Sequence, residues 1–373
     1  MPGSLDRPTI FARFSGKEIL GEWGRLLFSL LDAFHRAGCR VLLFEGLTAD
    51  DLGKYGPLAL SLERLSTTST CPDDTKDLIY LFDEQDPVLA RRTWRKKVRV
   101  RFDVFSPYWL DEPIVMPYPV HPVHARADLE LRVERCRITS RTIKLFFAGE
   151  TEGYLRNRVH YPEEKLTRTE IVDAIVRRID RLVMPASESE FAALLGGAAP
   201  PDRFVLIPPK SFRIASDQWL ETLAHAHFFL APPGFVMPMC HNIVEAMAVG
   251  TIPITNYPEW LTPHLKHRET CIAFRDEDDL IAKLEEVLRM NDAEVAAMRQ
   301  RVLDYCDHHL TANSFVRRVL GHSDDTVTVL MLTDANVVAN EKKLSARSFL
   351  MRGEAEGWPG KVRSTIRAFR RRA

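Results

Sequence analysis

The chain has 373 residues, and its 51 Lys and Arg side chains balance 51 Asp and Glu side chains, so its formal net charge at pH 7 is zero. Hydrophobic residues make up 45% of the sequence, as in a globular protein, and the length is sufficient for two domains. This charge balance argues against a nucleic-acid partner. The six cysteines show no CxxC spacing, and we find neither a leader sequence nor an apolar run of about 18 residues, so we expect a reduced, cytoplasmic protein.

The first residues predict a strand–helix–strand unit. An apolar strand at Pro8–Phe14 precedes an amphipathic helix over Leu20–Ala37, which Gly38 ends, and a second strand follows at Arg40–Phe44. This spacing indicates a parallel pair of strands. Other segments of this half predict strands at Leu78–Phe82, Val98–Phe105 and Leu145–Ala148, a wrapped loop at Ser106–His124 and a helix at Ile171–Val183.

The second half continues the alternation of strands and helices. Because 187–201 is rich in Ala, Gly, Ser and Pro, we place a domain boundary there. This predicts an N-terminal domain at 1–186, a C-terminal domain at 202–330, and an extension with a basic tail at 331–373. The fold class we expect is α/β, with two Rossmann-like domains facing a cleft. Strands are predicted at Phe204–Ile207 and Cys271–Phe274, and helices at 278–290 and 293–309.

The most informative segment is Phe228–Tyr257, FFLAPPGFVMPMCHNIVEAMAVGTIPITNY. Its pattern indicates a buried strand, a Pro/Gly loop, a short helix with one acid, a glycine and a second buried strand. Open parallel sheets bind ligands at the carboxyl ends of their strands, and a helix start offers N–H groups to a diphosphate. Glu245, about one turn into the helix, is placed to accept hydrogen bonds from ribose hydroxyls. The layout therefore predicts a site for a nucleotide sugar.

The same residues resemble a known family. PPGFVMPMCHNIVEAMAVGTIPI is similar to the C-terminal donor-binding domain of GT-B-fold glycosyltransferases, most closely the exostosin-like group. LFFAGETEGYLRNRVHY resembles the segment that exostosin-like proteins place before that domain, and the resemblance covers about residues 204–320. It implies GT-B architecture and an enzyme that transfers a sugar from a nucleotide-sugar donor to a glycan or lipid-linked acceptor.

Donor binding is expected to come mainly from the second domain. Lys210 and Arg213 follow its first strand, where the resemblance implies cations that stabilise the diphosphate leaving group. Gly234 would let a ligand approach the backbone. Asn242 is placed to cap the helix, so Glu245 fits either a capping box or a ribose ligand, and the two roles are compatible. The predicted donor-binding residues are Lys210, Arg213, Pro233, Gly234, His241, Asn242 and Glu245.

The N-terminal domain is expected to bind the acceptor and to supply any catalytic base. An inverting transferase needs an Asp, Glu or His that takes the acceptor proton, whereas a retaining one does not, and the sequence leaves this open. Glu150 is the favoured base because it follows a strand and a glycine. The other candidates are Asp103, His160, His121 and His124. The residues predicted on the acceptor or diphosphate side are Arg13, Ser15, Gly16, Tyr154 and Arg156.

Asp276–Glu277–Asp278 spells the D-x-D pattern that binds metal in the other large glycosyltransferase fold. Here the acids open a helical pattern, DLIAKLEEVL, and acids complement the dipole at a helix start. We therefore predict a helix N-terminus rather than a metal site. No essential metal or other cofactor is expected, and the nucleotide sugar is a co-substrate.

The tail Lys361–Arg372, KVRSTIRAFRRR, has no acid, and its apolar residues fall on one helical face. Such a segment suits either an anionic membrane surface or a solubilising terminus. We expect a cytoplasmic enzyme in bacterial cell-surface polysaccharide or lipopolysaccharide synthesis, and the first interpretation of the tail would place it peripherally on the inner face of the membrane. Three alternatives stay open: a nucleotide-sugar epimerase on the same fold, a non-catalytic glycan- or nucleotide-binding relative, and an interaction protein that uses the tail.

Overall fold

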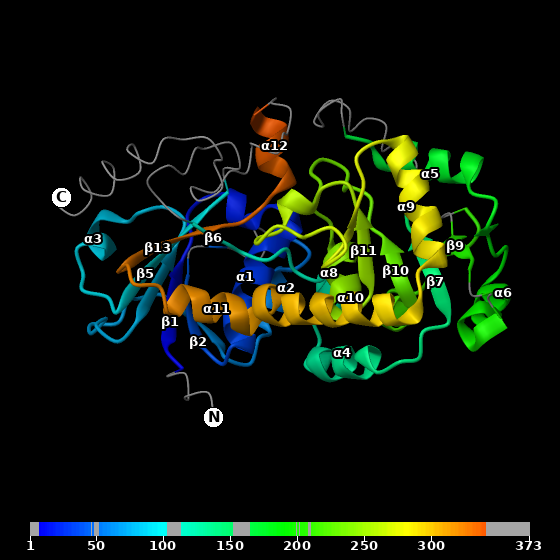
Figure 1. Ribbon diagram of the computed structural model, residues 1–373. Coiled ribbons are helices and arrows are strands. Elements are labelled where there is room, and N and C mark those ends of the chain that lie inside the picture. The colour runs from blue at the N-terminus through cyan, green and yellow to red at the C-terminus, as the bar shows by residue number, and fades with distance from the viewer. Residues whose placement is uncertain are drawn as a thin grey trace. The chain divides into compact units, whose positions relative to one another are not determined.

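The computed structural model describes residues 7–45, 47, 52–102, 113–151, 165–198, 200, 202–207 and 210–340 (Figure 1). These residues divide into two compact units, one within 7–116 and 316–336 and the other within 117–315 and 337–340. Each unit has its own sheet, in which every strand pairing is parallel. This confirms the predicted pair of Rossmann-like α/β domains and agrees with the domain count and sheet type of GT-B architecture.

The sheet of the first unit has seven strands in the order β3-β2-β1-β4-β5-β13-β6. They are β1 (Thr9–Arg13), β2 (Arg40–Phe44), β3 (Leu65–Thr68), β4 (Ile79–Phe82), β5 (Lys96–Arg101), β6 (Ile114–Val115) and β13 (Thr326–Leu330). The residues of β4 are all buried, as are the middle three of β1. Continuous apolar runs of this kind are typical of parallel strands, whose two faces are both covered.

Helix α1 (Arg25–Arg36) follows β1 and buries the predicted apolar face. It begins at Arg25 rather than Leu20, because Glu22, Trp23 and Gly24 adopt left-handed φ values of 57°, 67° and 81°. Gly38, with φ of 85°, follows the helix end as predicted. The other helices of this unit are α2 (Gly56–Leu60) and α3 (Pro87–Ala90).

The sheet of the second unit has six strands in the order β12-β11-β10-β7-β9-β8. They are β7 (Ile143–Ala148), β8 (Leu182–Val183), β9 (Phe204–Ile207), β10 (Ala226–Leu230), β11 (Ile252–Thr255) and β12 (Ile272–Ala273). After β7 the chain adds strands first on one side and then on the other, so the order switches between β7 and β10. Ligand sites of open α/β sheets lie at such a switch point.

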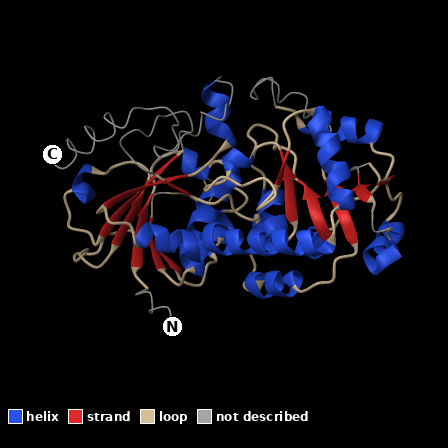
Figure 2. Cartoon of the chain, in the orientation of Figure 1, coloured by secondary structure: helices blue, strands red, loops and turns tan. Residues whose placement is uncertain are grey.

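Helices pack against this second sheet (Figure 2). They are α4 (Leu129–Arg137), α5 (Arg168–Arg178), α6 (Glu188–Ala193), α7 (Trp219–Ala224), α8 (His241–Ala248), α9 (Glu277–Arg289) and α10 (Asp292–Tyr305). Two more, α11 (Ala312–Leu320) and α12 (Asp334–Asn340), contain residues of both units. Within the described ranges no helix is both long and apolar enough to cross a bilayer.

The unit boundaries differ from the predicted domains at 1–186, 202–330 and 331–373. The strand at Leu145–Ala148 belongs to the second sheet, where β7 pairs with β9 and β10, and β13 returns to the first sheet beside β5. The small-residue stretch at 187–201 contains α6 and links β8 to β9 within the second unit. An apolar strand does not specify its sheet by composition, and Ala/Gly/Pro-rich connections occur inside domains as well as between them.

Candidate functional site

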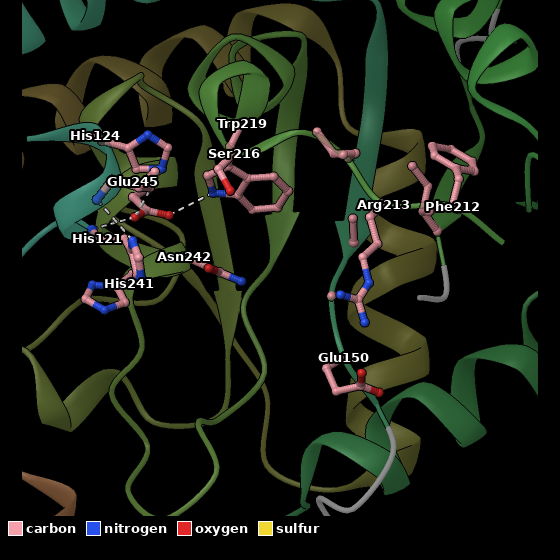
Figure 3. Close-up of a pocket in the computed structure, with 15 residues that line it drawn as sticks. His121, His124, Glu150, Phe212, Arg213, Ser216, Trp219, His241, Asn242 and Glu245 are labelled. Atoms are coloured by element: carbon pink, nitrogen blue, oxygen red, sulfur yellow. Dashed lines mark hydrogen bonds and ion pairs between the residues drawn. The ribbon is translucent and has the colours of Figure 1, made fainter. Parts of the chain in front are cut away.

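A pocket of about 490 Å³ lies within the second unit, at the carboxyl ends of β7 and β9 and beside the start of α8 (Figure 3). It is lined by His121, Val123, His124, Ala148, Gly149, Glu150, Ile207, Phe212, Arg213, Ile214, Ser216, Trp219, His241, Asn242 and Glu245. Its volume falls in the range of small-molecule sites, and its place in the sheet is the one expected for a ligand. Of the predicted donor-binding residues, the pocket brings together Arg213, His241, Asn242 and Glu245.

Glu245 is the central acid of the pocket and is only 1% exposed. Its Oε1 accepts a hydrogen bond from the backbone N–H of His121 at 2.8 Å, and its Oε2 accepts one from the indole N–H of Trp219 at 2.7 Å. The predicted capping box is wrong: Cys240 is the N-cap of α8, no side chain caps the helix, and Asn242 lies inside it. The carboxylate instead ties α8 to the loop before α4 and to α7.

Burial sets the protonation states of Glu245 and His124. Desolvation raises the pKa of Glu245 to about 7, although the hydrogen bonds from His121 and Trp219 lower it in part. Burial, together with the nearby charges of His121, Arg132 and Arg126, lowers the pKa of His124 to about 4. The ring of His124 is therefore neutral at pH 7, and its contact of 3.8 Å between Nε2 and Glu245 Oε1 is not an ion pair at that pH. Perturbed carboxyl groups in pockets are typical of functional sites.

Two more imidazoles border Glu245 (Figure 3). Nδ1 of His241 lies 2.7 Å from the carbonyl oxygen of Pro119. Because a carbonyl only accepts, this Nδ1 carries a hydrogen and Nε2 of the neutral ring is an acceptor. Nδ1 of His121 accepts from the N–H of Val123 at 3.2 Å, and the rings of His121 and His241 meet edge to face at 5.0 Å. The loop before α4 thus holds polar groups against the start of α8.

Across the pocket, Arg213 and Glu150 lie together on the side opposite Glu245 (Figure 3). Arg213 is exposed, whereas Phe212 and Ile214 on either side of it are half-buried and give the wall an apolar part. Lys210 is exposed and is not a lining residue. The pocket therefore combines an acid and the start of a helix on one wall with a guanidinium on the other.

Glu150 lies just past the end of β7, as the sequence predicts, but this strand is part of the second unit. The expectation that the N-terminal domain supplies Glu150 is therefore wrong. The buried guanidinium of Arg168 fixes this region, because it donates to the carbonyl of Glu150 at 3.2 Å and to that of Pro233 at 3.1 Å. Glu150 and Arg213 thus belong to the same wall of one unit.

Pro233 and Gly234 are buried and do not line the pocket. A Cβ added at Gly234 would lie 2.5 Å from the carbonyl oxygen of Met237 and 2.8 Å from that of Met239. The close approach predicted at this glycine is therefore made by the loop's own backbone rather than by a ligand.

Gly234→Ala is expected to lower the free energy of unfolding by about 1–3 kcal/mol, because the new methyl group meets backbone atoms that cannot move aside cheaply. Denaturant unfolding would measure this change. Gly196→Ala is the matched control, since a Cβ there meets nothing within 4 Å. Equal stability of the Gly234 variant and the wild-type protein would contradict the tight loop.

In the first unit, the loop after β1 is held by acids that follow β4. The N–H groups of Ser15 and Gly16 donate to the buried carboxylate of Asp83 at 3.0 and 2.7 Å, and Arg13 forms an ion pair with Asp86. The glycine at 16 permits this approach, since a Cβ there would lie 2.9 Å from Asp83 Oδ2. The backbone amides of Ser15 and Gly16 therefore bind the carboxylate of Asp83. Contact between this loop and a ligand stays a prediction.

Four predicted site residues lie outside the described residues: Asp103, Tyr154, Arg156 and His160. The basic tail at 361–372 does so too. The helix start at Asp276 is confirmed, because its carboxylate accepts from the N–H of Asp279 at 2.9 Å and caps α9. In the part of the chain that the structure describes, no three His, Cys, Asp or Glu side chains are grouped to hold a metal ion.

The pocket also contains residues that the sequence analysis did not single out as ligands. Trp219 is the most informative, since a partly buried indole needs an acceptor for its N–H, and here that acceptor is the buried acid. The distance of 26 positions between them conceals this pairing in the sequence. The sequence suggests His124 only as a candidate base, whereas its neutral, buried ring is better suited to a fixed wall of the pocket.

No protein-family model matches the chain, and no curated protein matches it in sequence. Among solved structures, the chain is similar to a glycosyltransferase from Rickettsia africae, with 10% identity and a TM-score of 0.48 over 85% of this chain and 97% of that one. It is also similar to Anabaena HepE in complex with UDP and glucose, with 10% identity and a TM-score of 0.43 over 84% and 98%. A third, the N-terminal domain of Candida albicans trehalose-6-phosphate phosphatase, has 9% identity and a TM-score of 0.43 over 85% and 97%. At these scores the likenesses support no argument about the site.

Proposed function

We propose that this chain is a glycosyltransferase that binds a nucleotide-sugar donor in the pocket of the second unit and transfers the sugar to a glycan or lipid-linked acceptor. The main support is the buried carboxylate of Glu245, which lies on α8 beside a pocket of about 490 Å³ at the carboxyl ends of β7 and β9. The sequence resemblance to GT-B glycosyltransferases supports the same conclusion independently of the pocket geometry.

In this proposal the ribose lies against Glu245. Each carboxylate oxygen has two lone pairs, and each uses one for His121 or Trp219. The second lone pair on each oxygen can accept a hydrogen bond from one hydroxyl of the ribose diol. Since Trp219 and His121 fix the carboxylate, it does not have to lose side-chain freedom when the ligand binds.

The diphosphate lies between the start of α8 and Arg213. The start of α8, at His241 and Asn242, carries the positive end of the helix dipole, which suits phosphate oxygens. Arg213 adds a full positive charge from the opposite wall. As the sugar leaves, negative charge grows on the diphosphate, and both groups would stabilise it.

We assign the role of general base at the acceptor hydroxyl to the carboxylate of Glu150. It lies beside Arg213 on the pocket wall, and an inverting reaction would use it to take the acceptor proton. We further propose that no metal is essential, because Arg213 and the helix start supply positive charge at the leaving group. Full activity after chelation with EDTA would support this part of the proposal, and restoration of lost activity by a divalent cation would contradict it.

Nucleotide binding tests the proposal first. In a thermal-shift assay with UDP, GDP and CMP, stabilisation by one base and not by the others would name the donor class. No shift with any of them would contradict the proposal. Turnover then separates the alternatives: a transferase releases the free nucleotide only with an acceptor, an epimerase converts the donor alone, and a binding relative does neither.

Donor affinity is expected to fall as the pH drops from 8 to 6. Ribose hydroxyls donate to the ionised carboxylate, and the pKa of Glu245 is about 7, so below pH 7 binding must first remove a proton. The ionised fraction falls about tenfold over this interval, and the affinity should follow it. Calorimetry with a nucleotide sugar measures this, because its diphosphate does not titrate here. A flat profile for the wild-type protein would contradict ribose binding by Glu245.

The finer assignments belong to the same proposal. The sequence resemblance supports membership of the exostosin-like group. The free cysteines support a role in bacterial cell-surface polysaccharide or lipopolysaccharide synthesis, and the basic composition of 361–372 supports a peripheral location at an anionic membrane. Cosedimentation of the full chain with anionic but not with neutral vesicles would support the membrane location.

A further inference from the structure

Trp23, in the turn that joins β1 to α1, has the most exposed large apolar side chain described in the first unit, at 73%. Its backbone is left-handed, with φ of 67° and ψ of 33°, and it lies between Glu22 at φ 57° and Gly24 at φ 81°. Bulky residues rarely adopt this conformation, and strained backbone of this kind clusters at functional sites.

The fold holds this turn from several sides. The N–H of Tyr55 donates to the carbonyl of Trp23 at 3.0 Å. The loop that contains Gly53 packs closely against the backbone of Trp23, because a Cβ at position 53 would lie 2.8 Å from the carbonyl carbon of Trp23. At Gly24 a Cβ would lie 2.0 Å from the carbonyl oxygen of Leu52, and Glu22 forms an ion pair with Arg25. The turn therefore presents position 23 in one fixed orientation.

Stability alone does not favour tryptophan here. Gly or Asn occupies left-handed positions at lower cost, and an indole that is three-quarters exposed gains little from burial. The chain thus places a large aromatic ring at a strained position where it contributes little to the core. A role for the ring outside the protein core explains this combination.

The location and the chemistry indicate a sugar ring. The turn leaves the carboxyl end of β1, at the switch between β1 and β4 in the sheet order, and ligands of open α/β sheets bind there. The face of an indole is negative, whereas the C–H groups on one face of a hexose are slightly positive, so the two stack. Lys17 and Glu18 are exposed in the connection between β1 and α1, and Lys54 is exposed in the loop packed against it. Their charged side chains can form hydrogen bonds with the hydroxyl groups of a sugar.

We propose that Trp23 is a stacking platform for one saccharide ring of the acceptor. The proposal rests on the proposed function, because that function calls for a glycan acceptor. A protein partner fits less well: the core of a specific interface needs several apolar anchors over about 800 Å² on each side, whereas one indole covers about 150–250 Å². The other exposed large apolar side chains of this unit among the described residues are Leu60 and Val88.

Fluorine NMR of the full chain labelled with 5-fluorotryptophan tests this directly. Trp23→Phe and Trp219→Phe assign the two resonances that matter. Maltotriose, cellotriose, chitotriose and mannotriose serve as saccharide probes, and UDP, GDP and CMP as nucleotide probes. We expect at least one trisaccharide to shift the Trp23 resonance. A Trp23 resonance that no trisaccharide moves would overturn the platform. A Trp219 resonance that no nucleotide moves would count against the donor pocket instead.

A substitution series adds a second, independent readout. Trp23→Asn relaxes the left-handed backbone, so its melting temperature should equal or exceed that of the wild-type protein, while saccharide affinity falls about tenfold or more. Trp23→Tyr keeps a ring and should retain part of the affinity. Val88→Asn removes an equally exposed apolar side chain and should leave the affinity unchanged. Undiminished affinity in Trp23→Asn, or a lower melting temperature, would overturn the proposal.

Discussion

Glu245→Ala is expected to weaken binding of the nucleotide-sugar donor about 100-fold or more at pH 8. Two hydrogen bonds to a carboxylate contribute about 1.5–3 kcal/mol each, and every 1.4 kcal/mol is a factor of ten in affinity. Calorimetric titration of the variant with the donor identified in the nucleotide screen measures the loss. No other substitution in the pocket should reduce donor affinity as far, because Glu245 is the only buried carboxylate among its described lining residues.

Glu245→Gln separates this binding effect from a folding effect. In the wild-type protein the pKa of the folded-state Glu245 carboxyl is raised from its ordinary value of 4.5 to about 7. The ionised carboxyl therefore lowers the free energy of unfolding. This loss is absent below pH 4.5 and grows to about 3 kcal/mol above pH 7. A neutral amide removes this cost but leaves one of the N–H donors of His121 and Trp219 without an acceptor, at about 1–3 kcal/mol. Stability at pH 8 should therefore change little, while donor affinity falls and loses its pH dependence.

Glu221→Gln is the matched control for both variants. Glu221 lies on α7, pairs with Arg132 and is half exposed, and it is not a lining residue of the pocket. Its substitution should leave donor affinity unchanged. If Glu245→Gln binds the donor as tightly as the wild-type protein at pH 8, Glu245 has only the structural role of joining α8 to Trp219 and His121.

Arg213→Gln is expected to reduce kcat/KM about 100- to 1,000-fold, with the loss mainly in kcat. Arg213 faces the pocket from an exposed loop, so it contributes little to stability. Its charge is worth most when negative charge develops on the leaving diphosphate, and removing one such electrostatic contact costs a factor of this size in other enzymes. Steady-state kinetics with donor and acceptor measures the change.

The neighbouring cation Lys210 provides the control for Arg213. Both residues are exposed on the loop that follows β9, but only Arg213 lines the pocket. Lys210→Gln should therefore change kcat/KM by no more than about twofold, since basic residues on exposed loops contribute little unless they meet a ligand. A larger loss in Lys210→Gln than in Arg213→Gln would place the diphosphate elsewhere.

Periodicity and turn residues predicted most of the central strands and the pocket's helix. The apolar runs at β1, β4, β7 and β9 are long enough to be recognised because parallel strands are covered on both faces. The strands β6 and β8 were not predicted, since two residues show no detectable period. Strand β3, LSTT, was not predicted because it contains a single apolar residue. The helix start at α1 was predicted too early, because the left-handed backbone of Glu22 and Trp23 has no composition signal.

The candidate site was predicted in part. Glu245, Asn242, His241 and Arg213 do line one pocket, since strand–loop–helix order fixes which ends of the elements lie together. The partners of Glu245 were not predictable, because the N–H of His121 and the indole of Trp219 come from segments 124 and 26 positions away. The ligand contact expected at Gly234 is wrong, because this glycine is not a lining residue and the backbone it approaches is that of its own loop.

By itself, the sequence determined two parallel α/β domains and the segment that carries the acid, because hydrophobic period and turn chemistry are local properties of the chain. Only the tertiary structure decided which sheet each strand joins, that β7 and Glu150 belong to the second unit, and that the carboxyl of Glu245 is buried with its pKa near 7. Strand partners, burial and pKa depend on groups brought together across long sequence separations. The physical reason is that desolvation and hydrogen bonding act through space, whereas the patterns that reveal helices and strands act along the chain.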